Sequence, residues 1–311
     1  MTVERVAVIL NPSKAERAEL ESAFPDAPGT EVSWYETSAD DPGRAAAQRA
    51  LDDGADVLLA AGGDGTVRAV AEHLADTGSR AELGIIPLGT GNLLARNLDV
   101  PLGDPGAAFA RALEGPSRAI DIGWAEITLS GGGTERHAFA VMAGFGIDAH
   151  MITETDADLK DRAGWLAYVE SMGRAVSASE VIELRLAVDG GEAAEERAHT
   201  LIVGNCGSLQ GGITLLPDAD PADGELDLLI LNADGIGGWA DTLKNMVWDN
   251  GLKRLITGSE GVESSDSTAH RRATELTIEL DEPRVFEVDG DDLEETRRIG
   301  ISVQPGAVRV R

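Results

Sequence analysis

The chain has 311 residues, which is longer than most single domains and long enough for two. Its 55 acidic and 26 basic residues give a formal net charge of −29, which argues against a nucleic-acid-binding protein because phosphate backbones require a basic surface. The same charge opposes simple electrostatic docking on anionic lipid. The only cysteine, Cys206, cannot form an intramolecular disulfide, which favours a reducing compartment.

The N-terminal segment lacks the basic region, long apolar core and small-residue cleavage site of a signal peptide. No stretch reaches 18 uninterrupted apolar residues, the minimum for a membrane-spanning helix. We therefore expect a cytoplasmic protein. The excess of carboxylates further favours a salt-rich cytoplasm, in which screening relieves their mutual repulsion.

The first third of the chain alternates between strand and helix patterns. The expected strands are 6–10, 32–35, 56–61 and 83–87, and the expected helices are 14–23, 43–51, 67–74 and one beginning near Leu93. Continuous apolar strands that alternate with helices are typical of a parallel sheet covered on both faces.

The pattern changes near Asp121, after a boundary at 115–122. Short alternating segments, separated by glycine, aspartate and proline, are typical of antiparallel β structure. The expected strands in this part are 124–129, 182–188, 226–231, 275–280 and 299–303, and the expected helices are 162–176 and 237–256. The chain is thus predicted to combine an α/β domain with a β-rich domain.

Two glycine-rich loops each follow an expected strand and precede an expected helix. They are Gly62-Gly63-Asp64-Gly65-Thr66 and Gly89-Thr90-Gly91-Asn92. Glycines allow close backbone approach to a phosphate, and free N–H groups with the helix dipole attract its charge. Because both loops leave the carboxyl ends of parallel strands, we expect them to hold a triphosphate from two sides. Either loop alone is equally well explained as a tight turn, and neither fits the P-loop or the dinucleotide fingerprint.

Asp64 is the unusual member of the first loop. A carboxylate beside a phosphate is unfavourable unless it binds a cation or accepts a proton. The alternative is that Asp64 caps the following helix, a role for which Thr66 is an equal candidate.

The ordered set of motifs resembles the diacylglycerol kinase catalytic family, which includes sphingosine kinases, ceramide kinases and bacterial lipid kinases. Besides the two loops, the matching motifs are Asn11-Pro12, Thr37, 143–149, 203–205, 217–227, 288–291 and 303–310. The resemblance implies an ATP-binding α/β domain over 1–120, rejoined by a last strand at about 304–311. It also implies a β-sandwich-like lipid-substrate domain over 121–303.

The resemblance also implies roles for individual residues. ATP would be bound by Asn11, Thr37, Gly62, Gly63, Asp64, Gly65, Thr66, Gly89, Thr90, Gly91 and Asn92. The catalytic residues would be Asp289, Asp64 and Asp291, with Asp289 suited to orient or deprotonate the acceptor hydroxyl. Mg²⁺ would be held by Asp220 and Asp223, because hard oxygen donors suit this ion. The alternatives are a plain hairpin turn at Asp289-Gly290 and a solvated acidic loop around Asp220 and Asp223.

Two residues depart from the family pattern. Leu93 stands where bacterial members often have an aspartate, and Asp291 stands where glutamate is usual. These differences leave room for a catalytically weakened nucleotide- or lipid-binding protein. A second alternative, an NAD kinase-like enzyme, shares the first loop but lacks the second and typically has an Asn-Glu pair that is absent here.

The expected acceptor is a lipid alcohol such as diacylglycerol, which implies transient contact with a membrane surface. Two apolar stripes, at 165–172 and 239–247, would line an acyl channel, touch a bilayer or belong to the core. The five histidines have no ligand or triad spacing and are treated as structural. Relatives are often homodimers, and the sequence does not decide the oligomeric state.

Overall fold

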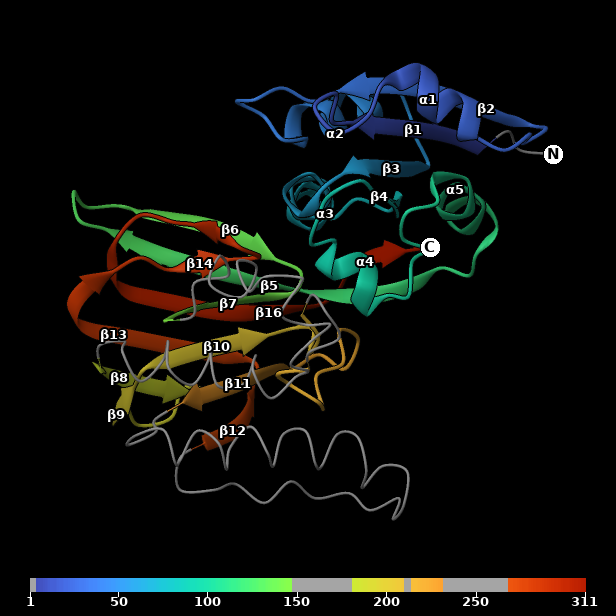
Figure 1. Ribbon diagram of the computed structural model, residues 1–311. Helices are drawn as coiled ribbons and strands as arrows, with labels where there is room; N and C mark the ends of the chain where they lie inside the picture. The colour runs from blue at the N-terminus through green and yellow to red at the C-terminus, as the bar shows by residue number, and fades with distance from the viewer. Residues whose placement is uncertain (1–3, 147–180, 210–213, 232–267) are drawn as a thin grey trace, which may run out of the picture.

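The computed structural model describes residues 4–146, 181–209, 214–231 and 268–311 (Figure 1). The predicted helices 162–176 and 237–256, and the apolar stripes within them, lie outside this part of the chain. No helix of the described segments has the length and apolar character needed to cross a membrane.

A parallel sheet forms the N-terminal part, as predicted from the apolar runs. Its strands are β1 (Glu4–Leu10), β2 (Thr30–Glu36), β3 (Val57–Gly62) and β4 (Glu82–Pro87). They pair in parallel in the order β2-β1-β3-β4. β3 is buried along its whole length, as expected for a central strand between two layers of helices.

Five helices accompany these strands. They are α1 (Arg17–Ala23), α2 (Arg44–Asp52), α3 (Asp64–Thr77), α4 (Leu93–Asn97) and α5 (Pro105–Glu114). α2 packs on α3, and α1 packs on α5. α1 begins later than predicted because residues 12–14 form a turn, in which the Asn11 carboxamide accepts hydrogen bonds from Ser13. α5 was not predicted, although Asp104 caps its start and Pro105 follows at the first helical position.

The remaining strands build the C-terminal part and join it to the first. They are β5 (Arg118–Leu129), β6 (Thr134–Phe139), β7 (Met142–Phe145), β8 (Ile182–Val188), β9 (Ala194–Ala198), β10 (Thr200–Gly204), β11 (Leu226–Leu231), β12 (Thr268–Ala273), β13 (Glu275–Arg284), β14 (Glu287–Val288), β15 (Asp291–Asp292) and β16 (Thr296–Val310).

β16 makes one mixed sheet out of the two parts. On one side, its last residues pair in parallel with β4 and its earlier residues pair antiparallel with β13. On the other side it pairs antiparallel with β5 at both its beginning and its end. The order is β2-β1-β3-β4-β16-β13-β8-β9, with β5 and β6 attached beside β16. Arg311 follows β16 and forms ion pairs with Glu4 and Glu82. The predicted domain boundaries at 120 and 303 therefore fall inside continuous strands, because β5 and β16 each cross from one part to the other.

A second, antiparallel sheet faces the C-terminal part of the first. Its order is β12-β11-β10-β7-β14-β15. Between the two sheets lies a separate hydrophobic core that includes Phe139, Leu228 and Phe286. This is the predicted β-sandwich, and it lies beside the carboxyl end of the parallel sheet (Figure 1).

Candidate active site

The predicted nucleotide residues lie at one edge of the parallel sheet. β1 ends just before Asn11 and β2 just before Thr37. β3 ends at Gly62, the first residue of the first glycine loop, and β4 ends two residues before the second loop. Three backbone hydrogen bonds tie these segments together: Asn11 N–H to Ala61 O (2.9 Å), Thr37 N–H to Leu10 O (2.9 Å) and Leu88 N–H to Gly62 O (2.8 Å). This is the edge at which parallel α/β sheets bind their ligands.

The two glycine loops touch each other backbone to backbone. A Cβ on Gly89 would lie only 2.7 Å from Gly63 Cα. Asn92, in the left-handed region at φ 49°, fixes the second loop. Its Oδ1 accepts from Gly89 N–H (2.9 Å), and its Nδ2 donates to Gly89 O (2.7 Å). Glycine is therefore required by contact between the loops.

Replacing Gly89 with alanine tests this contact. Inserting a methyl group into a packed position typically costs about 1–3 kcal/mol, so we expect ATP binding to weaken by about tenfold or more. Gly131→Ala is the matched control, because a Cβ there meets nothing within 4 Å. Calorimetric titration with ATP would compare the two variants, and unchanged affinity of Gly89→Ala would show that the loop contact is not needed.

Asp64 joins the loops through its side chain. Its two carboxylate oxygens accept from Asn92 N–H (2.7 Å) and Leu93 N–H (2.6 Å), at the start of α4. α3 itself begins at Asp64, earlier than predicted, with Gly63 as its N-cap residue. Asp64 thus caps a helix, but the helix is α4 rather than its own. Thr66 does not cap α3, whose N-cap residue is Gly63. Its buried hydroxyl lies 3.4 Å from Asn11 Nδ2.

Three basic residues surround the loops, and the sequence reasoning missed all of them. Lys14 Cε lies 4.0 Å from the position of a Cβ on Gly63, and Arg96 Nε donates to Gly91 O (2.7 Å). Arg68 lies on α3, one turn after Asp64. Helical spacing could have indicated Arg68, because a side chain one turn into a helix points back toward the loop that precedes the helix. In a chain with a net charge of −29, such a concentration of cations favours an anion site.

Asp289 and Gly290 form a two-residue hairpin turn between β14 and β15, with φ of 49° and 86°. The hairpin interpretation is therefore confirmed, and the turn also places the Asp289 carboxylate against three backbone N–H groups. The Asp289 carboxylate accepts from the N–H groups of Ala140 (2.8 Å), Val141 (2.9 Å) and Met142 (3.0 Å). Burial raises the pKa of the Asp289 carboxyl, although these donors and the Arg68 guanidinium act in the opposite direction.

Asp291 connects this hairpin to the first glycine loop. Its carboxylate forms an ion pair with Arg68. The same carboxylate lies 3.9 Å from the position of a Cβ on Gly65. The structure thus brings Asp64, Asp289 and Asp291 to one region from opposite ends of the chain.

The segment that holds Asp289 is fixed from behind by Asn205. The Asn205 side chain donates to the carbonyls of Ala140 (3.0 Å) and Asp121 (2.8 Å). The buried Asp121 carboxylate in turn accepts from Gly224 N–H (2.7 Å) and Gly306 N–H (2.6 Å). Asp121 therefore anchors both the acidic loop and β16, a role that no local sequence pattern indicates.

Asp220 and Asp223 each accept a hydrogen bond from within the acidic loop, and Asp223 also forms an ion pair with Arg272 of β12 (3.7 Å). Asp220 accepts from Ala222 N–H (3.1 Å), and Asp223 accepts from Glu225 N–H (3.0 Å). Within the segments that the structure describes, no three His, Cys, Asp or Glu side chains converge to hold a metal ion. These side chains alone do not make a magnesium cage, and their assignment as Mg²⁺ ligands stays a prediction.

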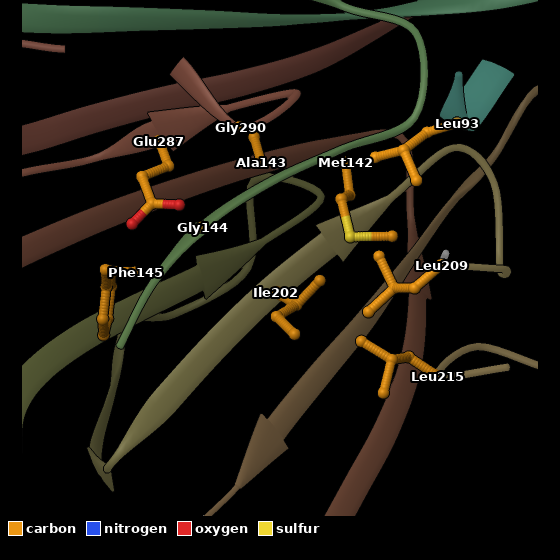
Figure 2. A pocket seen from close by; sticks show the side chains of 10 residues that line it. All are labelled: Leu93, Met142, Ala143, Gly144, Phe145, Ile202, Leu209, Leu215, Glu287 and Gly290. Carbon is orange, nitrogen blue, oxygen red and sulfur yellow. The ribbon is translucent and has the colours of Figure 1, made fainter. Parts of the chain in front are cut away.

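An apolar pocket lies between the second glycine loop and the Asp289 hairpin (Figure 2). Its lining residues are Leu93, Met142, Ala143, Gly144, Phe145, Ile202, Leu209, Leu215, Glu287 and Gly290. Figure 2 shows the side chains of Leu93, Met142, Ile202, Leu209 and Leu215 gathered at one end, with Phe145 and Glu287 at the other. Leu93, the departure from the family pattern, therefore belongs to the wall of an apolar pocket.

Comparisons with known proteins agree with this arrangement. Residues 5–125 match the family model of the diacylglycerol kinase catalytic domain, and residues 141–311 match that of the YegS C-terminal NAD kinase beta sandwich-like domain. A protein of Pseudomonas aeruginosa (strain UCBPP-PA14), named "Probable lipid kinase YegS-like", is 33% identical over 100% of this chain and 95% of its own length. A "Diacylglycerol kinase" of Staphylococcus aureus (strain bovine RF122 / ET3-1) is 30% identical over 75% of this chain and 72% of its own.

A solved structure has the same fold. The crystal structure of a diacylglycerol kinase from Bacillus anthracis str. Sterne aligns with a TM-score of 0.68 at 21% identity, covering 100% of this chain and 97% of that one. The α/β part and the β-sandwich part are thus a recurring combination.

Proposed function

Because the chain belongs to the diacylglycerol kinase catalytic family, we propose that it transfers the γ-phosphoryl group of ATP to the hydroxyl of diacylglycerol or a similar lipid alcohol. One observation carries the choice of acceptor. The apolar pocket adjoins both Leu93, beside the second glycine loop, and Gly290, beside Asp289. An acceptor with an apolar body and a hydroxyl end fits this juxtaposition.

The nucleotide half of the proposal is supported by the glycine loops. Their backbones approach so closely that a side chain is excluded at Gly89, and a Cβ on Gly91 would lie 2.8 Å from the Asp64 carboxylate. Lys14 and Arg96 add positive charge beside them. Backbone N–H groups and cations around glycines are the usual means of holding a polyphosphate.

The transfer itself requires a group that takes the acceptor's proton. In the proposed step, the hydroxyl oxygen bonds to the γ-phosphorus of ATP while the bond from that phosphorus to the bridging oxygen of ADP breaks. The hydroxyl proton passes to Asp289 Oδ2, which accepts one N–H group whereas Oδ1 accepts two. A raised carboxyl pKa favours this role, since a general base works best with a pKa nearer the working pH. Mg²⁺ bound with the nucleotide would neutralise developing phosphate charge.

Radiolabelled ATP offered with dispersed diacylglycerol, other lipid alcohols and NAD tests the proposal directly. The assay should run at low and at molar KCl, because a strongly acidic chain can require screening to fold. Labelled lipid phosphate is the expected product. Labelled NADP in its place would favour the NAD kinase-like alternative, and ATP binding without any transfer would favour a binding protein.

The pocket can be tested separately from the nucleotide site. Ile202→Asn places a smaller, polar side chain in the apolar wall, and the lost transfer energy of about 1.5–3 kcal/mol should raise KM for diacylglycerol about tenfold or more. ATP affinity should not change. Val32→Asn, at an exposed position on β2, is the matched control. Equal KM values in the two variants would exclude this pocket as the acceptor site.

We also propose that the protein works in a salt-rich cytoplasm and contacts the membrane surface only transiently. The 55 acidic side chains outnumber the 26 basic ones and repel one another. Added KCl screens this repulsion, so the melting temperature should rise between low and molar KCl. Thermal unfolding across a KCl series would measure it, with sucrose of equal osmolality as the control for preferential exclusion. A melting temperature that is flat or falls with KCl would reject the high-salt proposal.

A further inference from the structure

We propose that Arg68 is a further phosphate-binding residue of this site, and that it exchanges the Asp291 carboxylate for the terminal phosphate of ATP when the nucleotide binds. The inference rests on the proposed function only in taking ATP as the nucleotide. It adds a residue to the site and a change of partner on binding.

The environment of Arg68 favours a fixed guanidinium. Its side chain is 15% exposed, whereas that of Asp291 is 58% exposed. A guanidinium enclosed by protein loses little conformational entropy when it gains a ligand, and its planar N–H groups bind phosphate oxygens in pairs. The exposed carboxylate can return to water at little cost, since ion pairs of exposed groups contribute weakly.

The Arg68–Asp291 ion pair lies beside the first glycine loop, where the charge of a bound phosphate would favour replacement of the carboxylate. The Asp291 carboxylate lies against Gly65, the third glycine of the first loop. A carboxylate at a phosphate cradle repels a polyphosphate, and Arg68 neutralises it there. The terminal phosphate of ATP carries more negative charge than one carboxylate, so it competes for the same guanidinium. Lys14 lies beside Gly63 and Arg96 bonds to Gly91, whereas Arg68 lies on the hairpin side, where it pairs with Asp291.

The alternative is that the Arg68–Asp291 pair is only a strut between α3 and the β14–β15 hairpin. The two accounts predict opposite effects of the Asp291→Asn substitution on ATP binding. If the pair is a strut, removal of either partner loosens the same contact, and both variants weaken ATP binding. If Arg68 exchanges partners, Arg68→Ala weakens ATP binding while Asp291→Asn strengthens it, because it removes both the competitor and a like charge.

Calorimetric titration of the full chain with MgATP and MgADP, at a fixed KCl concentration, distinguishes them. We expect Arg68→Ala to weaken MgATP binding about tenfold, the loss of one charge-assisted bidentate contact. Asp291→Asn should tighten it by about threefold or more, and both effects should be smaller for MgADP. Arg68→Lys should fall between wild type and Arg68→Ala, and it replaces the alanine variant if that protein does not fold. Arg44→Ala is the matched control, since Arg44 also pairs with acids on α3 but at Glu72 and Asp76.

Weakening in both variants would overturn the exchange, as would unchanged MgATP binding in Arg68→Ala or an equal loss for MgADP and MgATP. Absence of MgATP binding in the wild type would overturn it as well. No lipid takes part in the titration. Opposite shifts without lipid phosphorylation would therefore refute the proposed function alone, and lipid phosphorylation without opposite shifts would refute this inference alone.

Discussion

Replacing Asp289 with asparagine should lower kcat for lipid phosphorylation by about 10²- to 10⁴-fold, the usual contribution of a positioned general base. Asparagine keeps the shape of the side chain but cannot accept the hydroxyl proton. Its amide nitrogen would also face one of the three N–H donors that now contact the carboxylate, an unmet donor that typically costs about 1–3 kcal/mol. Steady-state kinetics at saturating ATP, with thermal unfolding of the same samples, would measure both effects.

The pH dependence separates catalysis from folding. In the proposed step the ionised Asp289 carboxylate accepts the proton, so kcat of the wild type should fall as pH drops through the pKa of Asp289. Because burial raises that pKa, the fall should occur at a higher pH than for an ordinary aspartate, and Asp289→Asn should lack it. Asp292→Asn, on the exposed end of the same hairpin, serves as the control. Near-normal kcat in Asp289→Asn would contradict the proposed base.

Replacing Asp64 with alanine should weaken ATP binding by about 10²- to 10⁴-fold, because two hydrogen bonds to a charged group are lost and each is worth about 1.5–3 kcal/mol. Two N–H groups, those of Asn92 and Leu93, would lose the acceptor that holds the second glycine loop against the first. The loops would then separate, and the proposed binding of the triphosphate between them would be lost. Titration with MgATP would measure the change.

Asp64→Asn distinguishes loop anchoring from metal binding. Asparagine retains one acceptor oxygen, so anchoring predicts an intermediate loss, whereas a metal ligand predicts a loss close to that of alanine. Asp76→Ala, at the far end of α3, controls for the removal of one negative charge from this helix. Wild-type affinity in Asp64→Ala would refute the anchoring role.

The meeting of the two glycine loops at the carboxyl ends of the parallel strands could be predicted because it depends on local patterns. An apolar run such as 56–61 is a buried strand, and the glycine loop after it must leave the carboxyl edge of a parallel sheet. Asn11, Thr37 and both loops lie together for the same reason. The antiparallel character of the second half followed equally well from its alternating segments, as in β8 and β13.

The contacts that organise the site could not be predicted in the same way. Asp64 reaches the start of α4, and Asp291 reaches Arg68, across separations that no period or motif encodes. The cradle of N–H groups around Asp289 depends on Asn205 fixing the segment behind it. In the sequence, Leu93 is only a departure from the family pattern beside the second glycine loop. The fold shows that its side chain lines the apolar pocket.

The most direct test of the central claim is a single reaction in which ATP labelled at the γ-phosphate meets diacylglycerol dispersed in detergent, at a KCl concentration that keeps the protein folded. The label should appear in a lipid phosphate, with one ADP released per lipid phosphorylated, and Asp289→Asn should abolish nearly all of it. ATP that binds but leaves no label in any lipid alcohol, in folded protein at low and at molar KCl, would contradict a lipid kinase.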